Sequence, residues 1–299
     1  MIQTFKNLTR EQWLQHRAQD ITSTEVSALF GISPYCTKLE LWYQKKDSII
    51  VTLEDNDRMK WGTRLQDSIA KGIAQDNGWD ITPMNEYIRD PDYKIGSSFD
   101  FAIGDEGLLE IKNVDALQYR EKWSLEDGEL EAPAHIELQV QHQLLVTGRK
   151  FAYIGALIGG NEVRLIKREP QPAVFKHIKA EVIAFWDSIE ANEPPPPVFP
   201  DDAQFVSSLY GYASPGSVAR ANDEVTTMAL QYGELTRDIK VLTENKETLK
   251  AKMMMQIGEA EKVLGDGFSI SASVVGPTIV ETYERKGYRL FRVNIKKGK

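Results

Sequence analysis

The sequence predicts an α/β fold: a mixed sheet flanked by helices, followed by a C-terminal appendage of helix and small β-meander. Helical patterns alternate with β-rich runs up to about residue 190. Beyond them, the proline run at 194–197 cannot continue a helix and is typical of a stiff, extended connector. We therefore expect a first domain over residues 1–204 and a second over residues 205–299.

The first domain contains segments of both kinds in order along the chain. Helical spacing of apolar residues recurs at about 9–19, 24–30, 38–46, 57–77, 134–147 and 173–190. The β-rich runs are YIRD, KIGSSFDFAI, GLLEIKNV, KFAYIGALIGG and EVRLIKRE. Helices and strands mixed in this way favour a mainly mixed sheet with helices packed on it.

The second domain begins with a long apolar stripe at alternating spacings of three and four. Its members are Val225, Met228, Tyr232, Leu235, Ile239, Leu242, Leu249 and Met253. Because Lys246 interrupts the stripe, we expect a long helix or helical hairpin packed on the core or on another subunit, with a coiled coil as the alternative. The runs FSISASVV, TIVETYER and YRLFRVNIK then predict a small antiparallel meander.

Composition excludes several classes of protein. Cys36 is the only cysteine, so one chain cannot form a disulfide framework or a four-cysteine cluster. The chain has no 18-residue apolar run and no signal peptide, so we expect a soluble, cytoplasmic protein with no membrane partner. The formal charge of -8 argues against a protein that coats DNA over its whole surface.

Positive charge is nevertheless concentrated at the C-terminus. The last fifteen residues, RKGYRLFRVNIKKGK, hold seven basic residues and no acidic one. Such a segment is typical either of local contact with phosphates or of a solvated charged tail.

The stretch SSFDFAIGDEGLLEIKNVD contains the most informative chemistry. Glu110 and Lys112 lie two residues apart on a predicted strand, so their side chains share one face. A glycine-containing turn precedes that strand and brings Asp100 to the same place. Two carboxylates bind a hard divalent cation, and a nearby lysine can orient or deprotonate an attacking water. The alternative is an ordinary ion pair on a solvated strand face.

The helix predicted in EAPAHIELQVQHQLLVTG places His135, Gln139 and His142 at spacings of four and three. We interpret this face as the lining of a polar cleft. The alternative is a solvent-exposed surface opposite the apolar residues of the same helix.

Six segments in order resemble the YqaJ-like and lambda-type exonuclease family over roughly residues 10–200. They are ITSTEVSALFGISPY, WGTRLQ, GSSFD, LEIK, LQVQHQLLVTG and AFWDSIEANEPPPP. The resemblance implies a restriction-endonuclease-like fold with a P-D-(D/E)-x-K core. It also implies magnesium-dependent removal of 5′-mononucleotides from duplex DNA ends and a ring-shaped homotrimer.

The same resemblance implies roles for individual residues. Asp100 and Glu110 match the metal-binding carboxylates, and the backbone carbonyl of Ile111 would be a third ligand. Lys112 matches the catalytic lysine, and Gln139 matches a glutamine that positions the lysine or the water. We expect two Mg²⁺ ions in each active site, with Mn²⁺ able to substitute.

Further matches lie outside this core. Arg17 and Thr24 match the residues that hold the terminal 5′-phosphate, through a charged donor and a hydroxyl. Asp90 matches an accessory acidic residue. Two positions depart from the family pattern: Gln66 replaces a glutamate, and Phe99 replaces the proline before Asp100. Glutamine is the poorer magnesium ligand, and the neighbouring Asp67 points about 100° away on a helix.

The sequence therefore predicts a 5′-to-3′ exonuclease that leaves a 3′ single strand for phage-type recombination, working with a single-strand annealing protein. One alternative is an endonuclease on the same core, which would not need Arg17 and Thr24. Another is a catalytically silent DNA-binding or assembly protein, which Gln66 and the acidic charge would suit.

Overall fold

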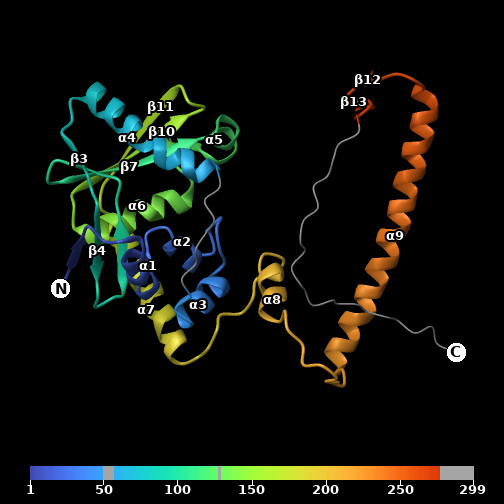
Figure 1. The fold of residues 1–299 in the computed structure, drawn as a ribbon, viewed down its shortest axis with the longest axis horizontal. Helices are drawn as coiled ribbons and strands as arrows, with labels where there is room; N and C mark the ends of the chain where they lie inside the picture. The colour runs from blue at the N-terminus through green and yellow to red at the C-terminus, as the bar shows by residue number, and fades with distance from the viewer. Residues whose placement is uncertain (50–56, 127–128, 277–299) are drawn as a thin grey trace. The chain divides into compact units, whose positions relative to one another are not determined.

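A computed structural model of the chain describes residues 1–49, 57–126 and 129–276 (Figure 1). The chain divides into two compact units, Met1–Phe205 and Val206–Lys299. We describe each unit by itself.

Within the described residues, the first unit contains two main sheets. The larger has the strand order β11 (Glu162–Arg168), β10 (Phe151–Ile158), β7 (Gly107–Val114), β6 (Phe101–Ile103) and β3 (Ile81–Pro83). The smaller has the order β1 (Gln3–Lys6), β4 (Glu86–Asp90), β5 (Ile95–Ser98) and β2 (Ile21–Thr22). β7 and β10 are parallel while β6 and β11 join them antiparallel, so the larger sheet is mixed as predicted.

Helices occur at all six predicted places. They are α1 (Arg10–Gln19), α2 (Val26–Leu29), α3 (Lys38–Lys46), α4 (Asp57–Asn77), α6 (Ala134–Thr147) and α7 (Pro172–Glu190). Local signals define several ends: Thr9 caps α1 in a capping box, and Gly148 ends α6 in the left-handed conformation.

The sequence did not predict several shorter elements. Besides the short strands β1, β2 and β3, they include α5 (Ala116–Lys122), α8 (Ala203–Leu209) and the hairpin of β8 (Ser124–Glu126) and β9 (Glu129–Glu131). Neither α5 nor α8 has a buried residue, and without a buried face a helix of seven residues has no apolar periodicity to detect.

Strand β7 separates two apolar cores. Leu109 and Ile111 pack with Ile69 and Ile73 of α4 on one side of the larger sheet. Leu108 belongs to the core on the other side, where α6 packs (Figure 1). Because strand side chains alternate, the side chains of β7 at even-numbered positions face α6. This alternation selects the face on which Glu110 and Lys112 lie.

The second unit contains α9 (Asp223–Ile257) and a hairpin of β12 (Lys262–Gly265) and β13 (Phe268–Ser271). The apolar stripe lies on one continuous helix, so the helical-hairpin alternative is wrong for this segment. No residue of α9 is buried. The runs TIVETYER and YRLFRVNIK and the basic C-terminus lie outside the described residues. None of the helices in the described ranges has both the length and the apolar character of a membrane span.

Candidate active site

The β6–β7 hairpin places Asp100 beside Glu110. Phe101 pairs with Leu109 in the antiparallel ladder, so the preceding residue, Asp100, comes level with Glu110. The turn between the strands passes through Gly104, whose φ of 51° suits a residue without a side chain. Asp100 is fixed there because its Oδ2 accepts a hydrogen bond of 2.7 Å from the backbone nitrogen of Ile111.

Glu110 and Lys112 leave the same face of β7, as their spacing predicted. Lys112 Nζ lies 2.8 Å from Glu110 Oε1, and the Glu110 residue is only 5% exposed. Glu110 is therefore shielded from bulk water, while the Lys112 side chain is 24% exposed. The burial of Glu110 excludes the interpretation as an ordinary ion pair on a solvated strand face.

Helix α6 contributes two glutamines to this pair. The amide nitrogen of Gln139 donates to Glu110 Oε1 at 2.7 Å, and its oxygen accepts from Lys112 Nζ at 3.0 Å. Gln143, one turn later, donates to Glu110 Oε2 at 2.8 Å. Sequence reasoning missed Gln143, although its i+4 spacing from Gln139 is the signal that could have found it.

The expectation for His142 was wrong. Its imidazole is completely buried, and Nε2 lies 3.2 Å from the backbone oxygen of Ile21 rather than near the carboxylates. The alternative of a solvent-exposed face is also wrong, because Gln139 and Gln143 are 7% and 1% exposed. Apolar contacts surround α6, so its polar side chains are buried among them.

Burial and like charge act on Asp100. Loss of solvent, followed by repulsion from Glu110, raises the pKa of Asp100 to about 7. Burial alone would lower the pKa of Lys112, but attraction to Glu110 and Asp100 outweighs it, and the pKa of Lys112 is raised. Lys112 is accordingly a charged donor in this site.

Gln66 occupies the position next to Asp100 despite the departure from the family pattern. A hydrogen bond from its side chain is among the contacts that lower the pKa of Asp100. Asp67 does not replace the missing carboxylate: its Oδ2 lies 2.6 Å from Lys71 Nζ, and the side chain is 56% exposed. The other departure, Phe99, is buried in the larger apolar core.

One cavity of about 470 Å³ joins the two groups of expected site residues. Arg17 and Thr24 line it together with Lys112, Gln139 and His135. Within it, the guanidinium of Arg17 lies 3.4 Å from the Thr24 hydroxyl. Thr24 does not begin a helix, because α2 starts at Val26 and its N-cap position is Glu25.

Two residues that the sequence did not single out support Arg17. Lys45, whose side chain is 4% exposed, donates to the backbone oxygen of Arg17 at 2.7 Å and to Glu25 at 2.8 Å. Glu25 in turn accepts from the backbone nitrogen of Thr22 at 3.0 Å. This ion pair connects α1, α2 and α3, and both of its residues line the cavity.

The remaining expected residues lie at different places. His135 is half-buried in the cavity wall and packs edge-to-face on Tyr35, with ring centroids 6.0 Å apart. Burial, followed by the charge of Lys112, lowers the pKa of His135. Asp90 instead accepts from the backbone nitrogen of Asp92 in the turn after β4. No hydrogen bond in the described part of the chain joins Asp90 to the other site residues.

The donor atoms suit a hard divalent cation. Asp100 and Glu110 supply carboxylate oxygens, and three hydrogen bonds to Glu110 leave one acceptor position open on Oε2. In the described ranges, no group of three or more acidic, histidine or cysteine side chains is placed to hold a metal. Two carboxylates still fit Mg²⁺, which keeps several waters in protein sites.

A comparison with known protein families finds a match over much of the first unit. Residues 12–150 match the model of the YqaJ-like viral recombinase domain. This region is therefore similar to that domain. A curated relative, the YqaJ protein of Bacillus subtilis, is 29% identical over 184 residues. The alignment covers 60% of this chain and 56% of the relative, so the chain spans little more than half of that protein.

Solved structures confirm the fold of the first unit. The alkaline exonuclease LHK-Exo of Laribacter hongkongensis superimposes with a TM-score of 0.52 at 23% identity. The match covers 61% of this chain and 94% of LHK-Exo. A second structure of LHK-Exo, in complex with dAMP, matches with the same TM-score at 22% identity. The predicted fold class, a mixed sheet flanked by helices as in these exonucleases, is therefore confirmed.

Proposed function

We propose that this chain is a magnesium-dependent exonuclease that digests one strand of double-stranded DNA from its 5′ end. One observation carries the proposal: a single cavity contains both Arg17 and Thr24 and the polar pair of Lys112 and Gln139. A strand end held by its 5′-phosphate at Arg17 would then have its first phosphodiester near Lys112. The exonuclease activity of LHK-Exo and its complex with dAMP support this assignment.

Each residue has a distinct part in this mechanism. Asp100, Glu110 and the backbone carbonyl of Ile111 would hold Mg²⁺, and Mn²⁺ could replace it. The bound ion would neutralise phosphate charge and lower the pKa of water. Lys112, kept charged by the two carboxylates, would orient the attacking water, and Gln139 fixes the position of its Nζ. Arg17 would pair with the terminal phosphate through its guanidinium.

The match to the viral recombinase model supports a proposal for the biological setting. Digestion from the 5′ end leaves a 3′ single strand, which suits phage-type homologous recombination with a single-strand annealing protein as partner. A homotrimeric ring around the DNA would keep the enzyme on its substrate. These assignments extend the proposal from the first unit to the whole protein.

The experiment that tests the proposal follows the products from duplex DNA over time. A linear duplex labelled at its 5′ end should release labelled mononucleotides from the first minutes in Mg²⁺ or Mn²⁺, while a covalently closed circle should stay intact. In Ca²⁺ the protein should bind DNA without hydrolysing it, because calcium prefers larger and looser coordination.

Other outcomes would favour the competing hypotheses. Cleavage of the closed circle would indicate an endonuclease on the same core. Binding without hydrolysis in Mg²⁺ and Mn²⁺ would indicate a DNA-binding or assembly protein. If a duplex labelled at its 3′ end instead released its label first, the polarity would be the reverse of the one proposed.

A further inference from the structure

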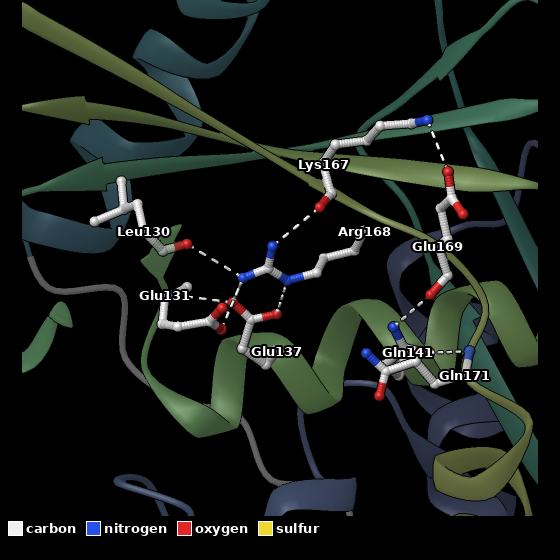
Figure 2. Close-up of polar contacts among 9 residues, drawn as sticks. Leu130, Glu131, Glu137, Gln141, Lys167, Arg168, Glu169 and Gln171 are labelled. Carbon is white, nitrogen blue, oxygen red and sulfur yellow. Dashed lines mark hydrogen bonds and ion pairs between the residues drawn. The ribbon is translucent and has the colours of Figure 1, made fainter. Parts of the chain in front are cut away.

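Helix α6 is held on its outer side by the segment 168–171, which begins at the last residue of β11. Figure 2 shows the guanidinium of Arg168 enclosed by acceptors. Arg168 binds Glu137 of α6 through two hydrogen bonds, from Nε at 2.7 Å and from Nη2 at 2.9 Å. Nη2 also donates to Glu131 at 2.8 Å. The bidentate contact between Arg168 and Glu137 fixes the orientation of the first turn of α6 as well as its distance from β11.

The same segment contacts α6 again one turn later. The amide nitrogen of Gln141 donates to the backbone oxygen of Glu169 at 2.9 Å, and its oxygen accepts from the backbone nitrogen of Gln171 at 3.0 Å. Gln141 is 4% exposed, so both bonds are shielded from water (Figure 2). Two successive turns of α6 are thus joined to the segment 168–171.

The opposite side of α6 carries the site. Residues two positions apart on a helix point about 200° away from each other. Glu137 and Gln141 therefore face the segment 168–171, while Gln139 and Gln143 face Glu110. A small rotation of α6 would change both sets of contacts together.

We propose that Arg168 and Gln141 are positioning residues of the nuclease site. They hold the rotation of α6 at which Gln139 reaches Glu110 and Lys112 at the same time. The inference rests on the proposed function, and it concerns the geometry of the site rather than contact with DNA. Active sites tolerate displacements of only about 0.5 Å before their chemistry slows.

Arg168→Lys keeps the positive charge but loses the bidentate contact with Glu137. We expect its kcat on linear duplex to fall roughly 10- to 100-fold with the KM for DNA unchanged, because a misplaced Gln139 affects the reacting groups and not the strand contacts. Gln141→Met keeps the side-chain volume but loses both hydrogen bonds. It should likewise lower kcat and leave the KM for DNA unchanged. Assays are run well below each variant's Tm so that every protein is folded.

A matched control lies on the same strand. Arg164 pairs with Glu162 at the surface, and its side chain is 51% exposed. Arg164→Lys makes the same chemical change without altering α6, and it should leave kcat unchanged.

A double-mutant comparison distinguishes positioning from general destabilisation. In a Gln139→Ala background, Arg168→Lys should have little further effect on kcat, because the side chain through which it acts is gone. An equal loss of kcat in both backgrounds, or a wild-type kcat in both Arg168→Lys and Gln141→Met, would overturn the inference.

The side-chain amide resonances of Gln139 and Gln143 provide a readout that needs no activity. We expect them to shift in Arg168→Lys and to stay in place in Arg164→Lys. Unmoved resonances in Arg168→Lys would refute the positioning role. If wild type fails to hydrolyse DNA, the proposed function fails, and these resonances still decide whether Arg168 and Gln141 set the position of α6.

Discussion

Lys112 Nζ lies 2.8 Å from Glu110 Oε1, and Gln139 binds both side chains. Replacing Lys112 with alanine removes the positive charge while the carboxylates remain. We expect Lys112→Ala to lower the hydrolysis rate by roughly 10²- to 10⁴-fold and to leave DNA binding largely intact. Single-turnover rates and binding curves measured on the same duplex check this. Undiminished hydrolysis by Lys112→Ala would refute the assignment of this active site.

The position of Gln66 next to Asp100 leads to a second prediction. Gln66→Glu adds a negative charge beside a carboxyl whose pKa is already raised by burial and by Glu110. Without metal, this variant should unfold at a lower temperature than wild type. Added Mg²⁺ should raise its Tm more than that of wild type, because a third carboxylate strengthens cation binding.

Gln66→Met is the matched control, since it adds no charge, and its response to Mg²⁺ should be no larger than that of wild type. Thermal unfolding across a magnesium series measures all three proteins. Equal magnesium responses in the glutamate and methionine variants would show that position 66 does not reach the cation.

The contact between Arg17 and Thr24 leads to a third prediction. If Arg17 binds the terminal phosphate, wild type should digest 5′-phosphorylated duplex faster than 5′-hydroxyl duplex. Arg17→Ala should erase that preference, because it removes a charged hydrogen bond that contributes about 1.5–3 kcal/mol to binding of the terminal phosphate. Initial rates of wild type and Arg17→Ala on the two substrates measure the preference.

Arg10 provides the control, because it is exposed at the start of the same helix. Arg10→Ala should keep the preference for the 5′-phosphate. If wild type shows no preference, or Arg17→Ala retains it, Arg17 is a surface charge only.

The buried imidazole of His142 leads to a fourth prediction, that the free energy of unfolding depends on pH. Burial lowers its pKa from 6.5 to about 4. A lowered pKa in the folded state means that the unfolded chain binds the proton more tightly. The contribution of neutral His142 to the free energy of unfolding is fully present above about pH 6.5. It is lost as pH falls towards 4, which lowers the free energy of unfolding by up to about 3 kcal/mol.

His142→Gln can keep the hydrogen bond to Ile21 but does not titrate, so its free energy of unfolding should fall less steeply over this range. The exposed His177 is the control, and His177→Gln should retain the wild-type slope. Urea unfolding at a series of pH values measures the three slopes. Parallel curves for wild type and His142→Gln would contradict the assignment.

The basic C-terminus gives a fifth prediction. Deleting the last fifteen residues removes seven positive charges. DNA binding should weaken and its dependence on salt should flatten, because fewer counterions are released from the phosphates. Binding measured across a salt series checks this, and unchanged curves would favour a solvated tail.

Local patterns predicted the long elements well. The expected bounds of α3, α4 and α6 agree with those observed, because apolar periodicity and end signals act over neighbouring residues. Shorter elements such as α5 and the β8–β9 hairpin were missed. Their conformation depends on the segments that they connect more than on any repeated pattern of their own.

Placement of polar residues on α6 was only partly predictable. Gln139 was identified, but His142 was assigned to the face that Gln143 in fact occupies. An amphipathic helix has one solvated side, and polar residues normally mark it. Because α6 is surrounded by protein, its polar residues lie on several sides, and only the packing partners decide which of them face Glu110.

The sequence by itself determined the arrangement of Asp100, Glu110 and Lys112, since a strand period of two and a short hairpin are local properties of the chain. Tertiary structure alone decided that Arg17 and Thr24 share a cavity with Lys112, and that Arg168 holds α6 from behind. These residues are far apart in sequence. Their proximity arises from burial of the apolar faces of the helices and sheets, which is a property of the whole domain.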